Sequence, residues 1–180
     1  MIKRLFIAFL WAFPSLLMAG NNNDDTVSPR FIFCESAINY EFRQHGIEPI
    51  SLRLSVGVKP ADKLSVTFNY TPRLTLYSNE DGRTFLRTPD AIGGGIGYRV
   101  FQSNREKLIF NESSAIDVRA AINSTLSHNE IKFTSYEIGL YLYNSKKPAA
   151  ISGLGLRHTS YHTPGMKDTY NVFIESGFRF

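Results

Sequence analysis

Only one cysteine, Cys34, occurs among the 180 residues, so no disulfide bond can form within the chain. We expect its side chain to act as a small apolar group in a strand. The 20 basic and 16 acidic residues form no block or stripe of one sign, which gives no indication of nucleic-acid binding. The four histidines lack the accompanying cysteine or acidic spacing of a zinc site. We therefore expect no metal, no cofactor and no nucleic-acid partner.

No apolar run reaches the roughly 20 residues that a membrane-spanning helix needs. The longest, residues 5–17, is interrupted by Pro14, follows two basic residues and precedes small residues at positions 19 and 20. This order is typical of a secretory signal peptide and argues against an inner-membrane helix. We expect residues 1–19 to be that signal. Their removal leaves 18 basic against 16 acidic residues, a net charge of +2.

A convincing helical period is also missing, and alternation with a period of two residues takes its place after a polar segment at 20–27, which we expect to be a flexible mature N-terminus. The alternation is clearest at residues 64–77, where leucine, valine, phenylalanine and tyrosine share one face and polar residues share the other. One face is therefore apolar and the other polar. Similar segments bring the expected strands to eight, at 28–41, 49–58, 64–77, 91–101, 108–123, 131–144, 149–162 and 169–180.

The connections between these segments alternate in kind. Tight turns are expected at residues 59–62, 102–107 and 144–148, and looser polar loops at 43–48, 78–83, 124–130 and 163–168. An even number of antiparallel strands with short turns on one rim and longer loops on the other is typical of outer-membrane barrels. We therefore predict an all-β fold in which residues 28–180 form an eight-stranded, up-and-down, transmembrane β-barrel.

Charged residues indicate which face of the strands is the inside. If the apolar face contacts lipid, ten ionic side chains of both signs share the interior and can pair there. A soluble lipocalin-like barrel or sandwich is the alternative, in which the aliphatic face turns inward and the charges meet water. The ten side chains are Glu35, Arg53, Arg73, Arg99, Asp117, Arg119, Glu137, Arg157, Glu175 and Arg179.

The last eleven residues favour the membrane alternative. They form an amphipathic segment that ends on Phe180, with Tyr170, Val172, Ile174 and Phe178 on the same face. This segment resembles the C-terminal signal of bacterial outer-membrane proteins. The resemblance implies a location in the outer membrane of a Gram-negative cell, contact with outer-membrane lipid and lipopolysaccharide, and recognition of Phe180 by the assembly machinery of that membrane.

Eight strands enclose an interior that side chains fill, which argues against a general porin. We therefore expect a filled polar interior and a structural or surface-interaction role in the cell envelope. A proton path or gated path through the ionic groups is the alternative use of such an interior.

One segment carries possible chemistry. His158 and Ser160 lie two residues apart on the expected outer face of the seventh strand, near the outer leaflet. A histidine that accepts a serine proton, oriented by a carboxylate, is the general arrangement for ester hydrolysis. Residues 157–160 resemble the lipid A deacylase (PagL) family, which implies His158 as general base and Ser160 as nucleophile. Tyr161 stands where that family has asparagine, and Asp168 is the nearest substitute for its downstream glutamate. The alternative is that this His and Ser only meet lipid headgroups.

Overall fold

The computed structural model describes residues 32–42, 44–45, 47–78, 84–103, 114–144 and 148–180. The expected signal peptide and the expected flexible segment at 20–27 lie outside these residues. Within the described part of the chain, no helix is long and apolar enough to cross a membrane.

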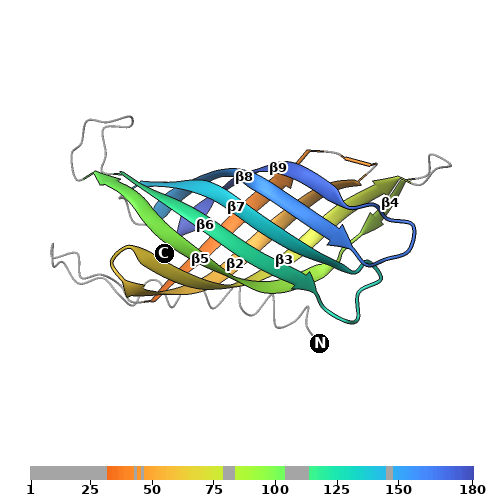
Figure 1. Cartoon of the computed structure of the whole chain (residues 1–180), viewed down its shortest axis with the longest axis horizontal. Coiled ribbons are helices and arrows are strands. Elements are labelled where there is room, and N and C mark those ends of the chain that lie inside the picture. The colour runs from red at the N-terminus through yellow and green to blue at the C-terminus, as the bar shows by residue number, and fades with distance from the viewer. Residues whose placement is uncertain (1–31, 43, 46, 79–83, 104–113, 145–147) are drawn as a thin grey trace.

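The described residues form nine antiparallel strands in one sheet (Figure 1). Eight of them close into a barrel, because β9 pairs with β1 and β2 pairs with β3 in addition to the other neighbouring pairs. The predicted eight-stranded, up-and-down barrel is therefore confirmed. The strands are β1 (Ile32–Glu41), β2 (Ile47–Ala61), β3 (Leu64–Ser78), β4 (Thr84–Arg87), β5 (Asp90–Ser103), β6 (Ser114–Thr125), β7 (Phe133–Asn144), β8 (Ala149–Tyr161) and β9 (Thr169–Arg179).

The strands differ from the expected ones at the turn after β2 and in the additional strand β4. The expected turn at residues 59–62 lies further on, because β2 runs to Ala61 and leaves residues 62–63 as the turn. A shift of register between Val58 and Ala61 lets the strand pass Pro60, as bulges commonly do for proline. The sequence pattern did not indicate β4, which pairs with the end of β3. Most of the expected turn at 102–107, together with the expected start of the strand at 108–123, lies outside the described residues.

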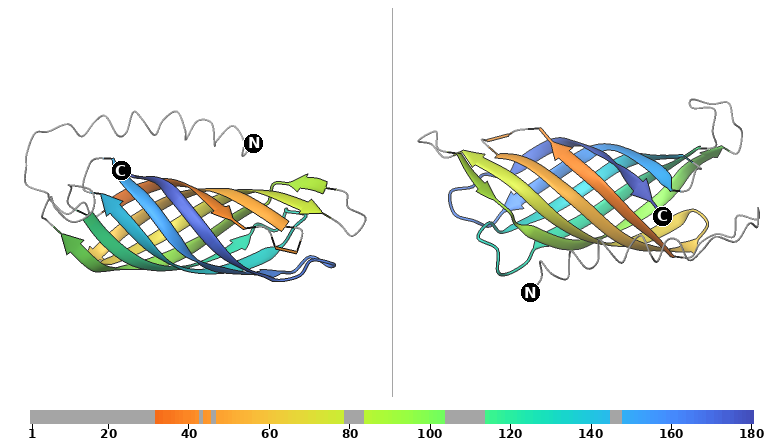
Figure 2. Two further views of the ribbon diagram at one scale, coloured as in Figure 1. Left: turned by 90° about the horizontal axis from the view of Figure 1, so that it is seen from above. Right: turned by 180° about the vertical axis from the view of Figure 1, so that it is seen from behind.

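The barrel has two unlike ends, which the two views of Figure 2 show with the strands tilted between them. We call the end where β1 begins and β9 ends the terminal rim. The opposite end, where β1 meets β2 and β8 meets β9, is the loop rim.

Apolar and ionic side chains are divided between the two faces of the barrel wall as we predicted from the positions of the charged residues. Leu156, Ile96 and Phe68 are 62%, 60% and 59% exposed on the outside. All ten predicted ionic side chains face the lumen, where nine are buried residues and the Arg99 side chain is 15% exposed. The alternative of an aliphatic centre is wrong for this chain, since Val66 and Leu74 also lie on the exposed face.

Aromatic side chains share the lumen with the ions, which the sequence pattern did not indicate. The guanidinium of Arg157 lies 5.0 Å from the ring centroid of Phe173, and that of Arg179 lies 4.1 Å from that of Tyr143. Stacking on aromatic faces suits arginine, because its planar cation is weakly hydrated. Glycine makes room for these rings: a Cβ on Gly155 would stand 2.6 Å from Phe173. The interior is thus packed with side chains.

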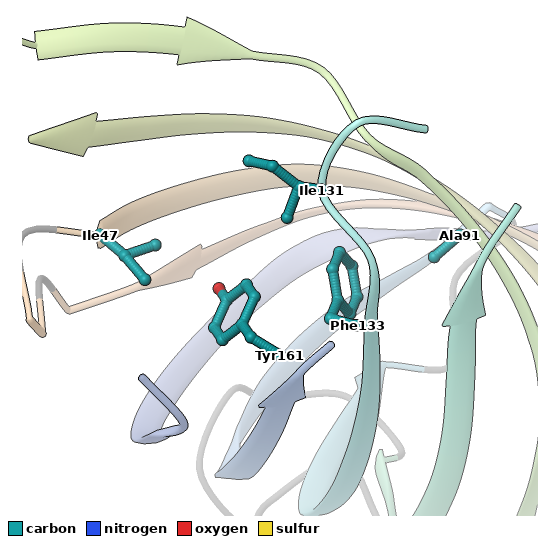
Figure 3. Close-up of a cluster of buried hydrophobic side chains, with 5 residues drawn as sticks. All are labelled: Ile47, Ala91, Ile131, Phe133 and Tyr161. Atoms are coloured by element: carbon teal, nitrogen blue, oxygen red, sulfur yellow. The ribbon is translucent and has the colours of Figure 1, made fainter. Parts of the chain in front are cut away.

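A cluster of buried apolar side chains lies at the loop rim (Figure 3). It is formed at the loop-side ends of four barrel strands and in the segment before β7, by Ile47, Ala91, Ile131, Phe133 and Tyr161. Phe133 and Tyr161 meet edge to face with their ring centroids 5.9 Å apart, and Met166 packs against the cluster from the connection between β8 and β9. The polar interior is therefore bordered by buried apolar side chains at the loop rim.

Candidate functional site

The outer face of β8 near the loop rim carries the predicted histidine and serine. In the register of the sheet, His158 lies between Tyr136 of β7 and Tyr170 of β9. The His158 ring is nearly parallel to both, at 17° and 4.3 Å from Tyr170 and at 14° and 6.1 Å from Tyr136. The flat neighbours on both strands set the plane of the imidazole. Amphipathic rings of this kind favour the border between hydrocarbon and water.

Asp168, just before β9, brings an acid to this pair. Its Oδ2 accepts a hydrogen bond of 3.1 Å from the Ser160 hydroxyl and lies 3.6 Å from His158 Nε2. Its Oδ1 accepts a hydrogen bond of 2.9 Å from the backbone N–H of Tyr161. The Tyr161 N–H first, and the Ser160 hydroxyl and His158 after it, hold the pKa of Asp168 below its usual value. Asp168 is therefore an ionised acceptor.

The structure brings the three predicted residues together, but not in the order of a hydrolytic triad. In such a triad the imidazole stands between the serine and the acid. Here the Ser160 hydroxyl donates a hydrogen bond to Asp168. The buried Nε2 of His158 neither donates nor accepts a hydrogen bond within the described residues. The Ser160 hydroxyl is thus hydrogen-bonded to the Asp168 carboxylate, which is a weak base. For ester hydrolysis its hydroxyl must turn from Asp168 toward His158.

The connection from β8 to β9 positions Asp168 by an ordinary turn. The backbone N–H of Met166 donates to the carbonyl of Thr163 at 3.3 Å, and Gly165 has a φ of 82°, a conformation that suits glycine. Thr163 Oγ1 in turn accepts a hydrogen bond of 2.8 Å from the backbone N–H of Lys132. The loop is therefore tied to the segment before β7.

The other histidines do not join this cluster as metal ligands. His162 Nε2 lies 3.1 Å from the hydroxyl of Thr134, and among the described residues no group of three or more His, Cys, Asp or Glu side chains could hold a metal ion. Glu175, the next acid along the chain, faces the lumen and accepts a hydrogen bond from Asn39. Asp168 is thus the acid close to His158 and Ser160.

In the lumen, the ionic side chains form two chains of alternating sign. The first lies toward the loop rim and consists of Arg73, Glu41, Arg157, Glu137, Arg53 and Glu175, each paired with the next. Asn123 and Asn171 donate further hydrogen bonds to Glu137 and Glu41. Three arginines and three carboxylates make this chain neutral, as buried charges require.

The second chain lies toward the terminal rim and is not neutral. It consists of Arg99, Asp117, Arg179, Glu35 and Arg119, again each paired with the next. Tyr141 stands between the two chains, since its hydroxyl accepts a hydrogen bond from Arg53 and its ring lies 4.7 Å from the guanidinium of Arg119. Three arginines against two carboxylates leave one excess positive charge.

Glu41 is the one member of these chains that the sequence prediction missed. It is 1% exposed and pairs with Arg73 and Arg157. Its signal was present, because it follows Glu35 by an even number of residues and therefore shares the inner face. The prediction omitted Glu41 because it is the last residue of the expected strand at 28–41, where the alternating pattern ends.

No protein-family model matches the chain, and no curated protein matches it by sequence. Among solved structures, the crystal structure of the N-terminal β-barrel domain of Pseudomonas aeruginosa OprF is similar, with a TM-score of 0.43 and 12% sequence identity. The match covers 83% of this chain and 96% of that chain. At this identity the likeness concerns the fold alone.

Proposed function

We propose that the chain is a small outer-membrane β-barrel protein that has a filled polar interior and a structural or surface-interaction role in the envelope of a Gram-negative cell. The observation that carries this proposal is the inverted wall: aliphatic and aromatic side chains are exposed all around the barrel, while the ions are buried inside it. In water such a surface is unfavourable, but lipid hydrocarbon removes the cost.

The dimensions of the wall suit a membrane. A strand of 12 residues such as β7 rises along the barrel axis by about 28 Å at about 3.3 Å per residue and a tilt of about 45°. The apolar band of an outer-membrane barrel is about 25 Å tall. The strands of the wall also pair around a closed sheet, which leaves no open sheet edge to hydrocarbon.

The closed interior argues for a role outside the lumen. The two ion chains, the stacked rings and the apolar cluster at the loop rim occupy the space that a pore would need. The partners we propose are accordingly outer-membrane lipid and lipopolysaccharide around the wall, and the outer-membrane assembly machinery at the end of β9, where Phe180 is hydrogen-bonded to Cys34.

Separation of cell membranes tests the location. We expect the full chain, expressed in a Gram-negative host, to fractionate with the outer membrane, to need detergent for extraction, and to migrate differently on gels before and after boiling. In planar lipid bilayers we expect no steady open-pore conductance. A freely soluble protein, or large stepwise conductance, would refute the proposal.

A second candidate function is hydrolysis of an acyl ester of lipid A. The specific observation in its favour is that Asp168 lies close to both His158 and Ser160, on the outside of the barrel. His158 is nine residues beyond the start of β8, which lifts it by roughly 20 Å toward the loop rim, the height of the outer leaflet. In this proposal His158 is the general base, Ser160 the nucleophile and Asp168 the orienting acid.

Mass spectrometry of lipid A distinguishes the two candidates. The esterase predicts the loss of one acyl chain in cells that make the protein, and no loss with Ser160→Ala. Ser152→Ala is the matched control, because Ser152 is also exposed on the outer face of β8 but lies far from His158 along the strand. An unchanged lipid A profile with the unaltered chain rejects the esterase and leaves the barrel proposal standing.

A further inference from the structure

A small cavity lies in the lumen and is lined by members of both ion chains, Arg53 and Glu137 of the first and Arg119 of the second. It has a volume of about 10 Å³, which is room for about one water-sized particle. Gly95 and Gly97 of β5 form one wall, and Arg53, Arg119 and Tyr141 are among the residues on the others. Thr67 and Ala121 also line it and stay half-buried although they face the interior. The space is therefore small, and both polar and apolar atoms line it.

The charges of the two ion chains, taken together, do not balance. The ion chains of the described lumen contain six arginines and five carboxylates, and the surplus arginine belongs to the chain that ends on Arg119. Guanidinium groups stay protonated, so the lumen cannot shed this charge by losing a proton. A buried charge without a counter-charge is strongly unfavourable. Lys59, half-buried near the terminal rim, adds a further cation.

The two arginines that line the cavity carry unused donors. The Nε atoms of Arg53 and Arg119 are buried and make no hydrogen bond within the described residues, and both arginines are more than nine-tenths buried. Arg119 Nε lies 3.7 Å from the point where a Cβ on Gly97 would stand, at the glycine wall of the cavity. The Tyr141 hydroxyl accepts from Arg53 and keeps its own hydrogen to donate.

One carboxylate, Glu137, also lines the cavity, but it is already engaged. Its Oε1 accepts a hydrogen bond of 2.5 Å from Asn123, and its Oε2 is paired with Arg53 and with Arg157. It therefore neutralises the first chain and leaves the surplus of the second unchanged.

We propose that this cavity binds one small monovalent anion of the halide class, which supplies the missing negative charge. Two guanidinium N–H groups and a phenolic O–H are the donors, and the glycine wall provides the room. This binding goes beyond the envelope role proposed above. It stabilises the folded barrel, because an anion that binds only the folded state lowers the free energy of that state. Larger anions such as gluconate do not fit a space of about 10 Å³.

Thermal unfolding of the full chain, purified from membranes in detergent, tests the proposal. At equal ionic strength, so that general screening is matched, we expect a higher unfolding temperature in sodium chloride than in sodium gluconate. Above saturation, each tenfold rise in chloride should add about 3–6 °C. Equal unfolding temperatures in the two salts overturn the proposal.

A pair of variants links the effect to the cavity. Ala121→Asp places a carboxylate in the cavity wall and should abolish the difference between chloride and gluconate, whereas the nearly isosteric, neutral Ala121→Asn should retain it. A difference that persists in Ala121→Asp contradicts the site. If Ala121→Asp does not fold, crystals of the unaltered protein soaked in sodium bromide decide: an anomalous peak beside Arg53 and Arg119 is expected, and its absence refutes the proposal.

Discussion

Arg119 and Glu35 lie on opposite walls of the barrel, 84 residues apart in the chain, and are joined by two parallel hydrogen bonds of 2.7 Å each. Two such bonds between a planar guanidinium and a carboxylate hold both groups in one orientation. The same Glu35 accepts a hydrogen bond of 2.6 Å from Arg179. One carboxylate thus connects β1 with β6 and β9 through the lumen.

Removing that carboxylate should weaken the barrel. We expect Glu35→Gln to lower the free energy of unfolding by about 3–5 kcal/mol, because two buried arginines lose their partner. Glu130→Gln is the control, since the Glu130 side chain is 75% exposed in its pair with Arg87 and should contribute less than about 1 kcal/mol. Circular dichroism during urea unfolding in lipid vesicles measures both. Equal effects of the two variants would mean that the lumen pair contributes little.

A charge on the outer wall tests whether lipid surrounds it. Leu154, 58% exposed near the middle of β8, should cost about 2–4 kcal/mol when replaced by arginine, because the new cation lies in hydrocarbon. His162→Arg, at the loop rim, should cost no more than about 1 kcal/mol. Unfolding in lipid vesicles again measures the difference. A Leu154→Arg protein as stable as His162→Arg is incompatible with a membrane-embedded wall.

Glycine at position 155 is required by close approach of two strands. A Cβ there would stand 2.4 Å from the carbonyl oxygen of Ile138 and 2.6 Å from Phe173. We expect Gly155→Ala to destabilise the barrel by about 1–3 kcal/mol through overpacking. Gly94→Ala is the control, because the nearest atom to its Cβ is 3.3 Å away. The fraction that migrates as folded protein on unboiled gels reports both, and an equally folded Gly155→Ala would contradict the packing described.

The loop rim should respond to acid through Asp168. Because its pKa is lowered in the folded state, chiefly by the Tyr161 N–H, its contribution to stability is complete above the ordinary Asp pKa of about 3.9 and is lost as the pH falls through the lowered value. We expect the Tyr161 amide signal in nuclear magnetic resonance spectra to titrate with a midpoint below about 3.9. In Asp168→Asn this titration should vanish. A midpoint above the ordinary value would show that the contact does not favour the ionised acid.

The candidate site was only partly predictable from the sequence. His158 and Ser160 share a face because alternate residues of a strand always do, and that relation is local. The contact of Asp168 with both depends on the turn around Gly165, which the pattern of residues cannot specify in three dimensions. Tyr136 and Tyr170 become neighbours of His158 only through the register of β7 and β9 against β8. Cross-strand register depends on the whole sheet.

The sequence by itself determined the eight strands of the barrel and their two faces, since a period of two residues and the polarity of each position are properties of the local chain. It also determined that arginines and carboxylates would meet inside, because buried charges must pair. Only the tertiary structure decided which of them meet. The pairs of Glu41, the neutral and the cationic ion chain, and the cavity between them arise where the closed barrel brings distant strands together. No local pattern encodes a distance across a lumen.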